Sequence, residues 1–403
     1  MSTATQRRRR VLLLTPRWPY PVIGGDLLRI WHLAQELSRH HDLTLLSLCD
    51  SAAQLHAEVP DDGVFRAVHR VLHPRWRTAL NLLRALPGSE PLQVAYYRNP
   101  AFRERLRSLA PQHDVVWCHL VRMAPYAMVC PQPRWIEMTD AISMGMARVA
   151  DSGLPAWSVR RWLYQLEARR LRPLEQSMPR HFDLVSLIAR PDAAHLWGAD
   201  PARWPAAVRL VPNGTTAVRT PPTPAGHRAP SIAFVGQMRS LANQDALEFL
   251  LTDVLPRVRR AVPAVQVHVV GPCPPELQRR WSGLSGVRLH GVVADLASVL
   301  GHCRVGACPV RIGAGMQNKL LDYLAHGMAA VTSPVGLEGL NLVPEQELLL
   351  ANHAEEWAAQ LTRLLTDDAL ASRVGTQGWE AVRDRHTWSH ALAPWTQAVR
   401  DSA

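Results

Sequence analysis

The segment 309–327, PVRIGAGMQNKLLDYLAHG, carries the residue types best suited to chemistry in this chain. It contains Lys319, the single lysine among 45 basic residues, since the other 44 are arginines. A strand ends near Pro309, a glycine-bearing loop follows, and a helix is expected to begin near Gly315 or Met316. Free amides at a helix start bind anions, whereas a lysine in the first turn opposes the helix dipole by about 0.3–1 kcal/mol. A phosphate at this helix start would remove that cost.

Asp322 follows Lys319 by three residues and therefore lies on the same helix face. One helix end therefore offers backbone amides, an ammonium and a carboxylate, a combination that suits a nucleoside diphosphate. The amides and Lys319 would bind the phosphates, and Asp322 would bind the ribose hydroxyls. The same spacing also fits a surface Lys–Asp pair on a solvated helix. The pattern GxxxxGK followed by Ser or Thr is absent, so this is not a Walker A loop.

The first half of the chain offers weaker candidates. Gly24 and Gly25 lie between the first expected strand and a helix, where they form either a loop that meets phosphate or acceptor, or a simple turn with a helix cap. His119 and Asp140 each end a strand-like run. A histidine there can transfer a proton or orient a hydroxyl, and the alternative is one loop histidine among 18. No GxGxxG occurs, so a dinucleotide cofactor is not supported.

Arg239 and Asn243 follow the strand-like run 232–236, where a phosphate could bind, whereas 212–214, Pro-Asn-Gly, is interpreted as a turn. Metal-ligand spacing is missing, because none of the six cysteines forms a CxxC pair, and no metal is expected. No GxSxG nucleophile motif is present.

The elements that must position these residues alternate between short apolar strands and helices. This alternation predicts mostly parallel sheets covered by helices on both faces, the α/β class. Ligands of such sheets bind beyond the carboxyl ends of the strands. The expected strands are 11–14, 43–49, 64–71, 115–119, 135–138, 184–188, 208–211, 232–235, 265–270, 287–293, 305–309 and 330–333.

A proline-rich segment divides the chain into two parts. We expect a first domain over 1–215, a linker over 216–230 and a second domain over 231–387. The stretch 388–403 has helical spacing and could return to the first domain. Two Rossmann-like α/β domains are the expected architecture.

The composition excludes several classes of protein. The 47% apolar content is that of a globular protein, and no apolar run is long enough to span a membrane or to form a signal peptide. We therefore expect a cytoplasmic protein with reduced cysteines. The net charge of +11 would suit nucleic acid, a membrane surface or an anionic substrate. Nucleic acid is disfavoured, because the arginines form neither a stripe nor an aromatic-interleaved motif.

Taken together, these motifs resemble the GT-B glycosyltransferases of family 4, and most of all the sugar transferases of bacterial exopolysaccharide gene clusters. The segment 309–322 is similar to that group's PLRIARGIQNKVLE signature, and 323–331 resembles its AMAxGxPVV. The segment 238–246 resembles MxxxPNxDA, with Ala242 in place of the proline. The amino-terminal PRWPYP with its glycine pair, and VPNG at 211–214, match common family patterns.

The resemblance implies two Rossmann-like domains that face each other across a cleft, and a retaining transfer of sugar from a nucleotide-sugar donor without a metal. Carried over by position, the catalytic residues are His119, Lys319 and Arg239. The donor-binding residues implied are Gly24, Gly25, Gly236, Arg239, Gly313, Ala314, Gly315, Met316, Gln317, Asn318, Lys319 and Asp322.

The chain departs from the family pattern at several of these positions. Ala314 stands where the first glutamate of E-x7-E would fall, and Asp322 replaces the second. The usual arginine and lysine after the first strand of the second domain are Gln237 and Ala242, so the phosphate charge is expected to fall on Lys319, Arg239 and Arg311.

Several functions remain open at this point. The acceptor implied is a lipid-linked glycan at the inner membrane surface, which would fit the run Arg7–Arg10, or else a soluble natural product. A sugar-nucleotide 2-epimerase shares the two-domain fold and needs no acceptor. A GT-B protein that only binds or scaffolds is favoured by Ala314 and disfavoured by Lys319, Asp322 and His119.

Overall fold

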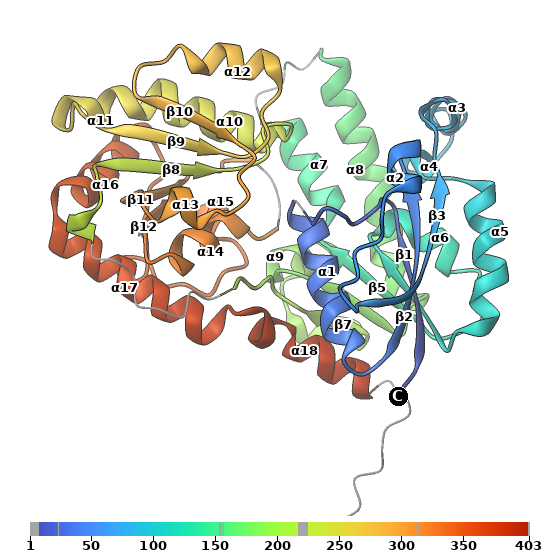
Figure 1. Cartoon of the computed structure of the whole chain (residues 1–403). Coiled ribbons are helices and arrows are strands. Elements are labelled where there is room, and N and C mark those ends of the chain that lie inside the picture. The colour runs from blue at the N-terminus through green and yellow to red at the C-terminus, as the bar shows by residue number, and fades with distance from the viewer. Residues whose placement is uncertain are drawn as a thin grey trace, which may run out of the picture. The chain divides into compact units, whose positions relative to one another are not determined.

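The computed structural model describes residues 8–22, 24–152, 155, 157–216, 225–312 and 315–401. The chain separates into two compact units, one of Met1–Val211 with Leu392–Ala403 and one of Pro212–Ala391. Each unit contains one parallel sheet with helices on both faces (Figure 1). The expectation of two Rossmann-like parallel-sheet domains is thereby confirmed.

The first sheet has seven strands in the order β3-β2-β1-β4-β5-β6-β7. Its central strands are buried on both faces, which explains why they read as continuous apolar runs in the sequence. The strand order reverses between β1 and β4, the place where open α/β sheets bind ligands. The strands are β1 (Arg10–Thr15), β2 (Asp42–Cys49), β3 (Phe65–Leu72), β4 (Val115–His119), β5 (Arg134–Thr139), β6 (Leu184–Leu187) and β7 (Val208–Leu210).

Helices of the first unit lie between these parallel strands along the chain. The apolar spacing in the sequence also predicts a helix over 157–178, and α8 occupies nearly all of that range. The helices are α1 (Gly25–Ser38), α2 (Ala52–His56), α3 (Arg75–Ala85), α4 (Leu92–Tyr96), α5 (Pro100–Leu109), α6 (Ala124–Ala127), α7 (Ile142–Asp151), α8 (Val159–Ser177) and α9 (Arg190–Trp197).

The last helix, α18 (Trp388–Asp401), contributes its residues from Leu392 onward to the first unit. Its Trp395 is fully buried, with ring centroids 5.6 Å from Trp117 and 6.1 Å from Trp135. Aromatic pairs at such separations stabilise by about 0.5–1.5 kcal/mol beyond the area that they bury. Trp395 therefore holds this helix against β4 and β5.

The second sheet has six strands in the order β10-β9-β8-β11-β12-β13, and its order reverses between β8 and β11. The loop after β9 requires glycine where it passes the loop after β8. A Cβ on Gly271, at φ +128°, would lie 2.1 Å from the carbonyl oxygen of Gly236. The strands are β8 (Ser231–Val235), β9 (Gln266–Val270), β10 (Val287–Gly291), β11 (Val305–Cys308), β12 (Ala329–Thr332) and β13 (Leu349–Leu350).

The helices of the second unit include one that contains a π-helical turn. The sequence predicts a helix over 245–261, whereas the structure begins this helix earlier, at Leu241, and continues it through the π turn Leu250–Val254. The helices are α10 (Leu241–Phe249), α11 (Leu255–Ala261), α12 (Pro275–Ser282), α13 (Ala297–Leu300), α14 (Asn318–Ala325), α15 (Pro334–Leu337), α16 (Ala354–Thr366) and α17 (Asp368–Arg385). Of the expected linker 216–230, residues 217–224 lie outside the described part of the chain.

Candidate functional site

The start of α14 is the centre of the candidate site in the second unit. The helix begins at Asn318, not at Gly315 or Met316, because Gly315 takes φ +77° and Gln317 is non-helical. Lys319 still falls in the first turn. No side chain caps this helix start within the part of the chain that the structure describes. The predicted donor-loop residues Gly313 and Ala314 lie outside the described residues.

Lys319 is buried beside the start of α10. Its Nζ donates a hydrogen bond to Asn243 Oδ1 over 2.5 Å and lies 5.0 Å from the centre of the Phe234 ring. Asn243 is itself oriented by the hydrogen bond from its Nδ2 to the carbonyl oxygen of Gln237, 3.0 Å away. Burial lowers the pKa of the Lys319 ammonium. The lysine singled out in the sequence is therefore held in a defined position by Asn243 and Phe234.

The charge balance around Lys319 indicates an anion site. No carboxylate among the described residues forms an ion pair with Lys319. The positive end of the α14 dipole adds to the same excess of positive charge. A buried ammonium next to an uncapped helix start is costly unless an anion compensates both.

Asp322 lies one turn further along α14 and meets the loop that precedes the linker. Thr215 Oγ1 donates a hydrogen bond to Asp322 Oδ1 over 3.2 Å, and Asn213 Nδ2 donates one to Asn318 Oδ1 over 2.7 Å. Burial raises the pKa of the Asp322 carboxyl to about 6. Because 212–214 was interpreted only as a turn, the sequence reasoning missed these contacts.

Gly214 shows why this loop has the sequence Asn-Gly-Thr. A Cβ at Gly214 would lie 2.5 Å from the backbone nitrogen and Cα of Trp388. Only glycine permits that approach, and it places the side chains of Asn213 and Thr215 against α14. The signal in the sequence was the glycine flanked by two short polar residues.

The two arginines expected to carry phosphate charge have different environments. Arg311 makes a bidentate ion pair with Asp245, with distances of 3.0 and 2.6 Å, and its guanidinium lies 4.4 Å from the centre of the Phe249 ring. Its charge is therefore already balanced. Arg239 is exposed, and no described residue forms an ion pair with it. Of the two, Arg239 is the cation left to meet a ligand.

Gly236 connects β8 to this arginine and lies under Asn243. A Cβ on Gly236 would come within 3.0 Å of the Asn243 side chain. The absence of that carbon allows Asn243 to reach Lys319. The structure thus brings Gly236, Lys319 and Asp322 together around the first turns of α10 and α14.

In the first unit, His119 ends β4 and is buried. Neither of its ring nitrogens has a hydrogen-bond partner among the described residues. Burial lowers the pKa of His119 to about 3, so the imidazole is neutral at pH 7. A neutral imidazole can donate one hydrogen bond and accept another, which suits the orientation of a hydroxyl better than acid catalysis.

The two glycines after β1 form the start of α1. Gly24 has φ +108° and precedes the helix, and Leu28 donates a backbone hydrogen bond to its carbonyl oxygen over 2.9 Å. Gly25 is the first residue of α1. Asp26 forms an ion pair with Arg17, whose positive charge holds the pKa of Asp26 low against the effect of burial.

The end of β5 is strained beside His119. Thr139 has φ +69°, a conformation that a β-branched residue rarely adopts, and its backbone N–H donates to Glu137 Oε1 over 2.9 Å. The next residue is Asp140, whose pKa is raised to about 7 by burial and by the neighbouring Asp192. Backbone strain of this kind clusters at functional sites, which favours this edge of the sheet as part of a binding site.

The described residues contain no group of three or more His, Cys, Asp or Glu side chains placed to hold a metal ion. None of the helices in the described part of the chain combines the length and apolar character that crossing a membrane requires.

Comparison with known protein families matches part of the second unit. Residues 229–367, which include β8, α10 and α14, match the family model described as glycosyl transferases group 1. No curated protein sequence matches the chain.

Solved structures extend the similarity to the whole fold. Sucrose-phosphate synthase from Thermosynechococcus elongatus is 17% identical, with a TM-score of 0.71 over 98% of this chain and 99% of that chain. HepE from Anabaena, in complex with UDP and glucose, is 11% identical, with a TM-score of 0.67 over 98% and 100%. Trehalose 6-phosphate synthase from Burkholderia multivorans is 14% identical, with a TM-score of 0.63 over 98% and 97%. The chain therefore has the GT-B fold, and its segment 229–367 matches the group 1 glycosyl transferases.

Proposed function

We propose that this protein is a retaining glycosyltransferase that uses a nucleoside diphosphate sugar, either UDP- or GDP-linked, and requires no metal. The observation that carries this proposal is the buried Lys319 ammonium at the uncapped start of α14, with no described carboxylate to balance it. A diphosphate leaving group supplies the missing negative charge. The UDP and UDP-glucose named with HepE, which has the same fold, favour a uridine nucleotide.

The proposed chemistry follows from where charge develops. The bond between the anomeric carbon and the phosphate oxygen breaks, the acceptor oxygen bonds to that carbon, and the acceptor proton is released with the nucleoside diphosphate. Lys319, Arg239 and the first amides of α14 stabilise the departing diphosphate. Preorganised cations and amides can do this in the place of a metal ion. His119 orients a hydroxyl of the sugar or of the acceptor, since its neutral ring can both donate and accept.

The acceptor that we propose is a lipid-linked glycan used for cell-surface polysaccharide. The amino-terminal arginine run contributes less to this proposal than its sequence suggests. Arg8 donates to the carbonyl oxygens of Ser38, Arg39 and His41 at the end of α1, and Arg10 is 3.6 Å from Asp114. Arg7 lies outside the described residues.

A panel of nucleotide sugars tests the proposed function. We expect calorimetry to detect binding of UDP or GDP, and turnover with a lipid-linked glycan acceptor to be insensitive to EDTA and to yield a product with the donor's anomeric configuration. A C2-epimerised sugar nucleotide formed without acceptor would replace the proposal with an epimerase. Absence of binding to every nucleotide would overturn it altogether.

The affinity for the nucleotide is expected to fall as the pH is lowered through about 6, where Asp322 becomes protonated. Burial raises the pKa of this carboxyl, so the form that accepts hydrogen bonds from ribose hydroxyls exists mainly above that pH. We expect roughly tenfold weaker UDP binding at about pH 5 than at about pH 7.5. Calorimetry at several pH values measures this change in UDP affinity.

The Asp322→Asn variant is the control for this pH dependence, because UDP itself also binds a proton on its phosphate in the same range. The variant should bind more weakly at neutral pH and retain only the pH dependence that the phosphate contributes. Identical pH profiles for the two proteins would exclude Asp322 as the titrating group.

A further inference from the structure

One face of α3 is apolar and exposed. Trp76, Leu80 and Leu83 follow the i, i+4, i+7 spacing of a single helix face, and 62% of Trp76 and 71% of Leu83 are exposed. The opposite face is packed, because Asn81 and Ala85 are buried. Leu86, just after the helix, is also exposed. Large apolar side chains gathered on one exposed face indicate an interaction surface.

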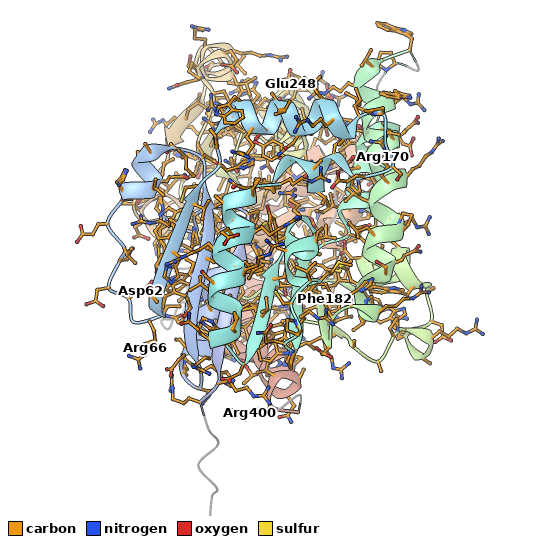
Figure 2. All side chains as sticks on the ribbon, turned by 90° about the vertical axis from the view of Figure 1, so that its right-hand side faces the viewer. Asp62, Arg66, Arg170, Phe182, Glu248 and Arg400 are labelled. Carbon is orange, nitrogen blue, oxygen red and sulfur yellow. The ribbon has the colours of Figure 1, made fainter. Side chains whose placement is uncertain are left out.

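The start of α8 adds two tryptophans to the same part of the first unit. Trp157 and Trp162 are 87% and 53% exposed, and Val159 between them is exposed as well. The two helices are tied together by Arg170 of α8, which donates to the carbonyl oxygens of Ala85 and Leu86 at the end of α3. Figure 2 shows α3 running toward α8, where Arg170 is labelled. We call the exposed face of α3 with residues 157–162 the tryptophan surface.

The charges on this surface all have one sign. The segments 63–89 and 155–166 contain no Asp or Glu, whereas they carry Arg75, Arg77, Arg84, Arg160 and Arg161. The guanidinium of Arg77 lies 4.9 Å from the centre of the Trp76 ring. Tryptophans that alternate with arginines match the boundary between lipid headgroups and acyl chains, where indole rings insert and guanidinium groups meet phosphates.

The tryptophan surface borders the sheet edge that holds the candidate residues of the first unit. Helix α3 follows the carboxyl end of β3, and α7, which leads into α8, follows the carboxyl end of β5. His119 and Asp140 lie at the carboxyl ends of β4 and β5 in the same parallel sheet. A membrane that contacts this surface would therefore present a lipid-linked acceptor at the predicted acceptor edge.

We propose that the tryptophan surface docks this protein on a bilayer that contains anionic lipids. The proposal deepens the proposed function by naming where its lipid-linked acceptor would be met. A second copy of the chain is the less favourable occupant, because a two-fold interface would bring the same arginines opposite one another. Apolar insertion and phosphate contacts instead satisfy both the tryptophans and the arginines.

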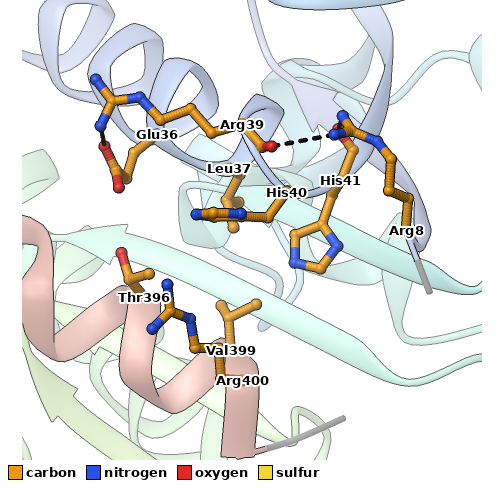
Figure 3. Close-up of a pocket in the computed structure, with 9 residues that line it drawn as sticks. All are labelled: Arg8, Glu36, Leu37, Arg39, His40, His41, Thr396, Val399 and Arg400. Atoms are coloured by element: carbon orange, nitrogen blue, oxygen red, sulfur yellow. Dashed lines mark hydrogen bonds and ion pairs between the residues drawn. The ribbon is translucent and has the colours of Figure 1, made fainter. Parts of the chain in front are cut away.

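A second basic region lies at the opposite end of the first unit and differs in character. A cavity of about 400 Å³ is lined there by Arg8, Arg39, His40, His41 and Arg400, among other residues (Figure 3). Arg8 caps the end of α1, and Arg39 pairs with Glu36 over 2.5 Å. None of the exposed large apolar side chains lies among its lining residues. This region therefore serves as the matched control for charge without tryptophans.

Vesicle cosedimentation of the full chain tests the proposal. We expect binding to vesicles of phosphatidylcholine mixed with phosphatidylglycerol, and weak binding to phosphatidylcholine alone. The variant Trp76→Ser/Trp157→Ser should lose at least about tenfold in affinity for the mixed vesicles, since each indole removes a large apolar area from water. Both side chains are exposed, so an unchanged thermal unfolding curve is expected and verifies folding.

The arginines give the second arm of the experiment. Arg75→Gln/Arg84→Gln should bind the mixed vesicles roughly tenfold more weakly, with a smaller loss on adding salt, whereas Arg39→Gln/Arg400→Gln removes the same charge and should bind like the wild type. Unchanged binding by the tryptophan variant, or loss of binding in the Arg39/Arg400 control, would overturn the proposal. So would light scattering that shows a dimer abolished by the tryptophan substitutions.

Nucleotide binding separates this proposal from the proposed function. Calorimetry with UDP in the absence of vesicles does not involve the tryptophan surface. If the protein binds UDP but not the mixed vesicles, only the docking proposal fails. If it binds the vesicles but no nucleotide, the proposed function fails and the docking surface stands.

Discussion

Replacing Lys319 by alanine is expected to lower kcat/KM for sugar transfer by about 100- to 1000-fold, the loss seen when one preorganised donor to a developing oxyanion is removed. The ammonium is held by Asn243 and the Phe234 ring at the start of α14, so it is ordered before the donor binds. Its charge has no described carboxylate to balance it and is therefore fully available to the departing diphosphate. Steady-state kinetics with a saturating acceptor measures the effect.

Two companion variants distinguish a chemical role of Lys319 from a packing role. Lys319→Met keeps most of the side-chain volume and should lose as much activity as Lys319→Ala while unfolding at the same temperature as the wild type or higher, because it removes a buried charge. Lys319→Arg should not restore activity, since the planar guanidinium needs more room than the ammonium between Asn243 and Phe234. Undiminished turnover by the alanine variant would contradict the assigned role.

The Arg29→Met variant is expected to reduce the free energy of unfolding by about 3–5 kcal/mol, the cost of leaving a buried charge unpaired. Arg29 of α1 and Glu137 of β5 are both fully buried, with Nε–Oε1 and Nη2–Oε2 distances of 2.7 and 3.0 Å. Glu137 also accepts hydrogen bonds from Ser186 and from the backbone of the strained Thr139. Urea denaturation followed by tryptophan fluorescence measures the loss.

Two controls accompany this stability measurement. The double variant Arg29→Met/Glu137→Leu should recover most of the stability, because it leaves no unpaired charge in the core. Arg257→Met breaks the exposed pair with Glu355, 3.1 Å apart, and should change stability by less than about 1 kcal/mol. If Arg29→Met unfolds at the midpoint of the wild type, the buried pair does not hold α1 against β5 in the way that the structure indicates.

Much of the fold could be predicted from the sequence because its signals are local. The run Val11–Leu14 predicts a strand buried on both faces, and β1 contains it. Lys319 could be identified as the candidate because its position in a first helical turn depends only on the neighbouring residues. The start of α14 was misplaced by two to three residues because Gln317 could continue the helix by its own propensity and does not.

The site required contacts between segments far apart in the chain. Asn213 and Thr215 meet Asn318 and Asp322 across more than 100 positions, and short polar residues in a loop carry no periodic signal of such a partner. Arg239 and Arg311 look equivalent as letters. In the structure, Asp245 balances the charge of Arg311, whereas no described carboxylate balances the charge of Arg239. This difference arises because α10 packs against the loop after β11 and brings Asp245 to Arg311.

The sequence by itself therefore determined the alternation of strands and helices, the lone lysine at a helix start and the family that these motifs resemble, because periodicity and spacing are properties of neighbouring residues. Tertiary structure alone decided which arginine keeps an unbalanced charge, which polar loop orients α14, and which tryptophans are core and which are surface. Trp395 is buried against Trp117 whereas Trp157 is exposed, and the residue type is the same. The physical reason is that burial and charge balance depend on what packs across the fold, and no local pattern encodes that partner.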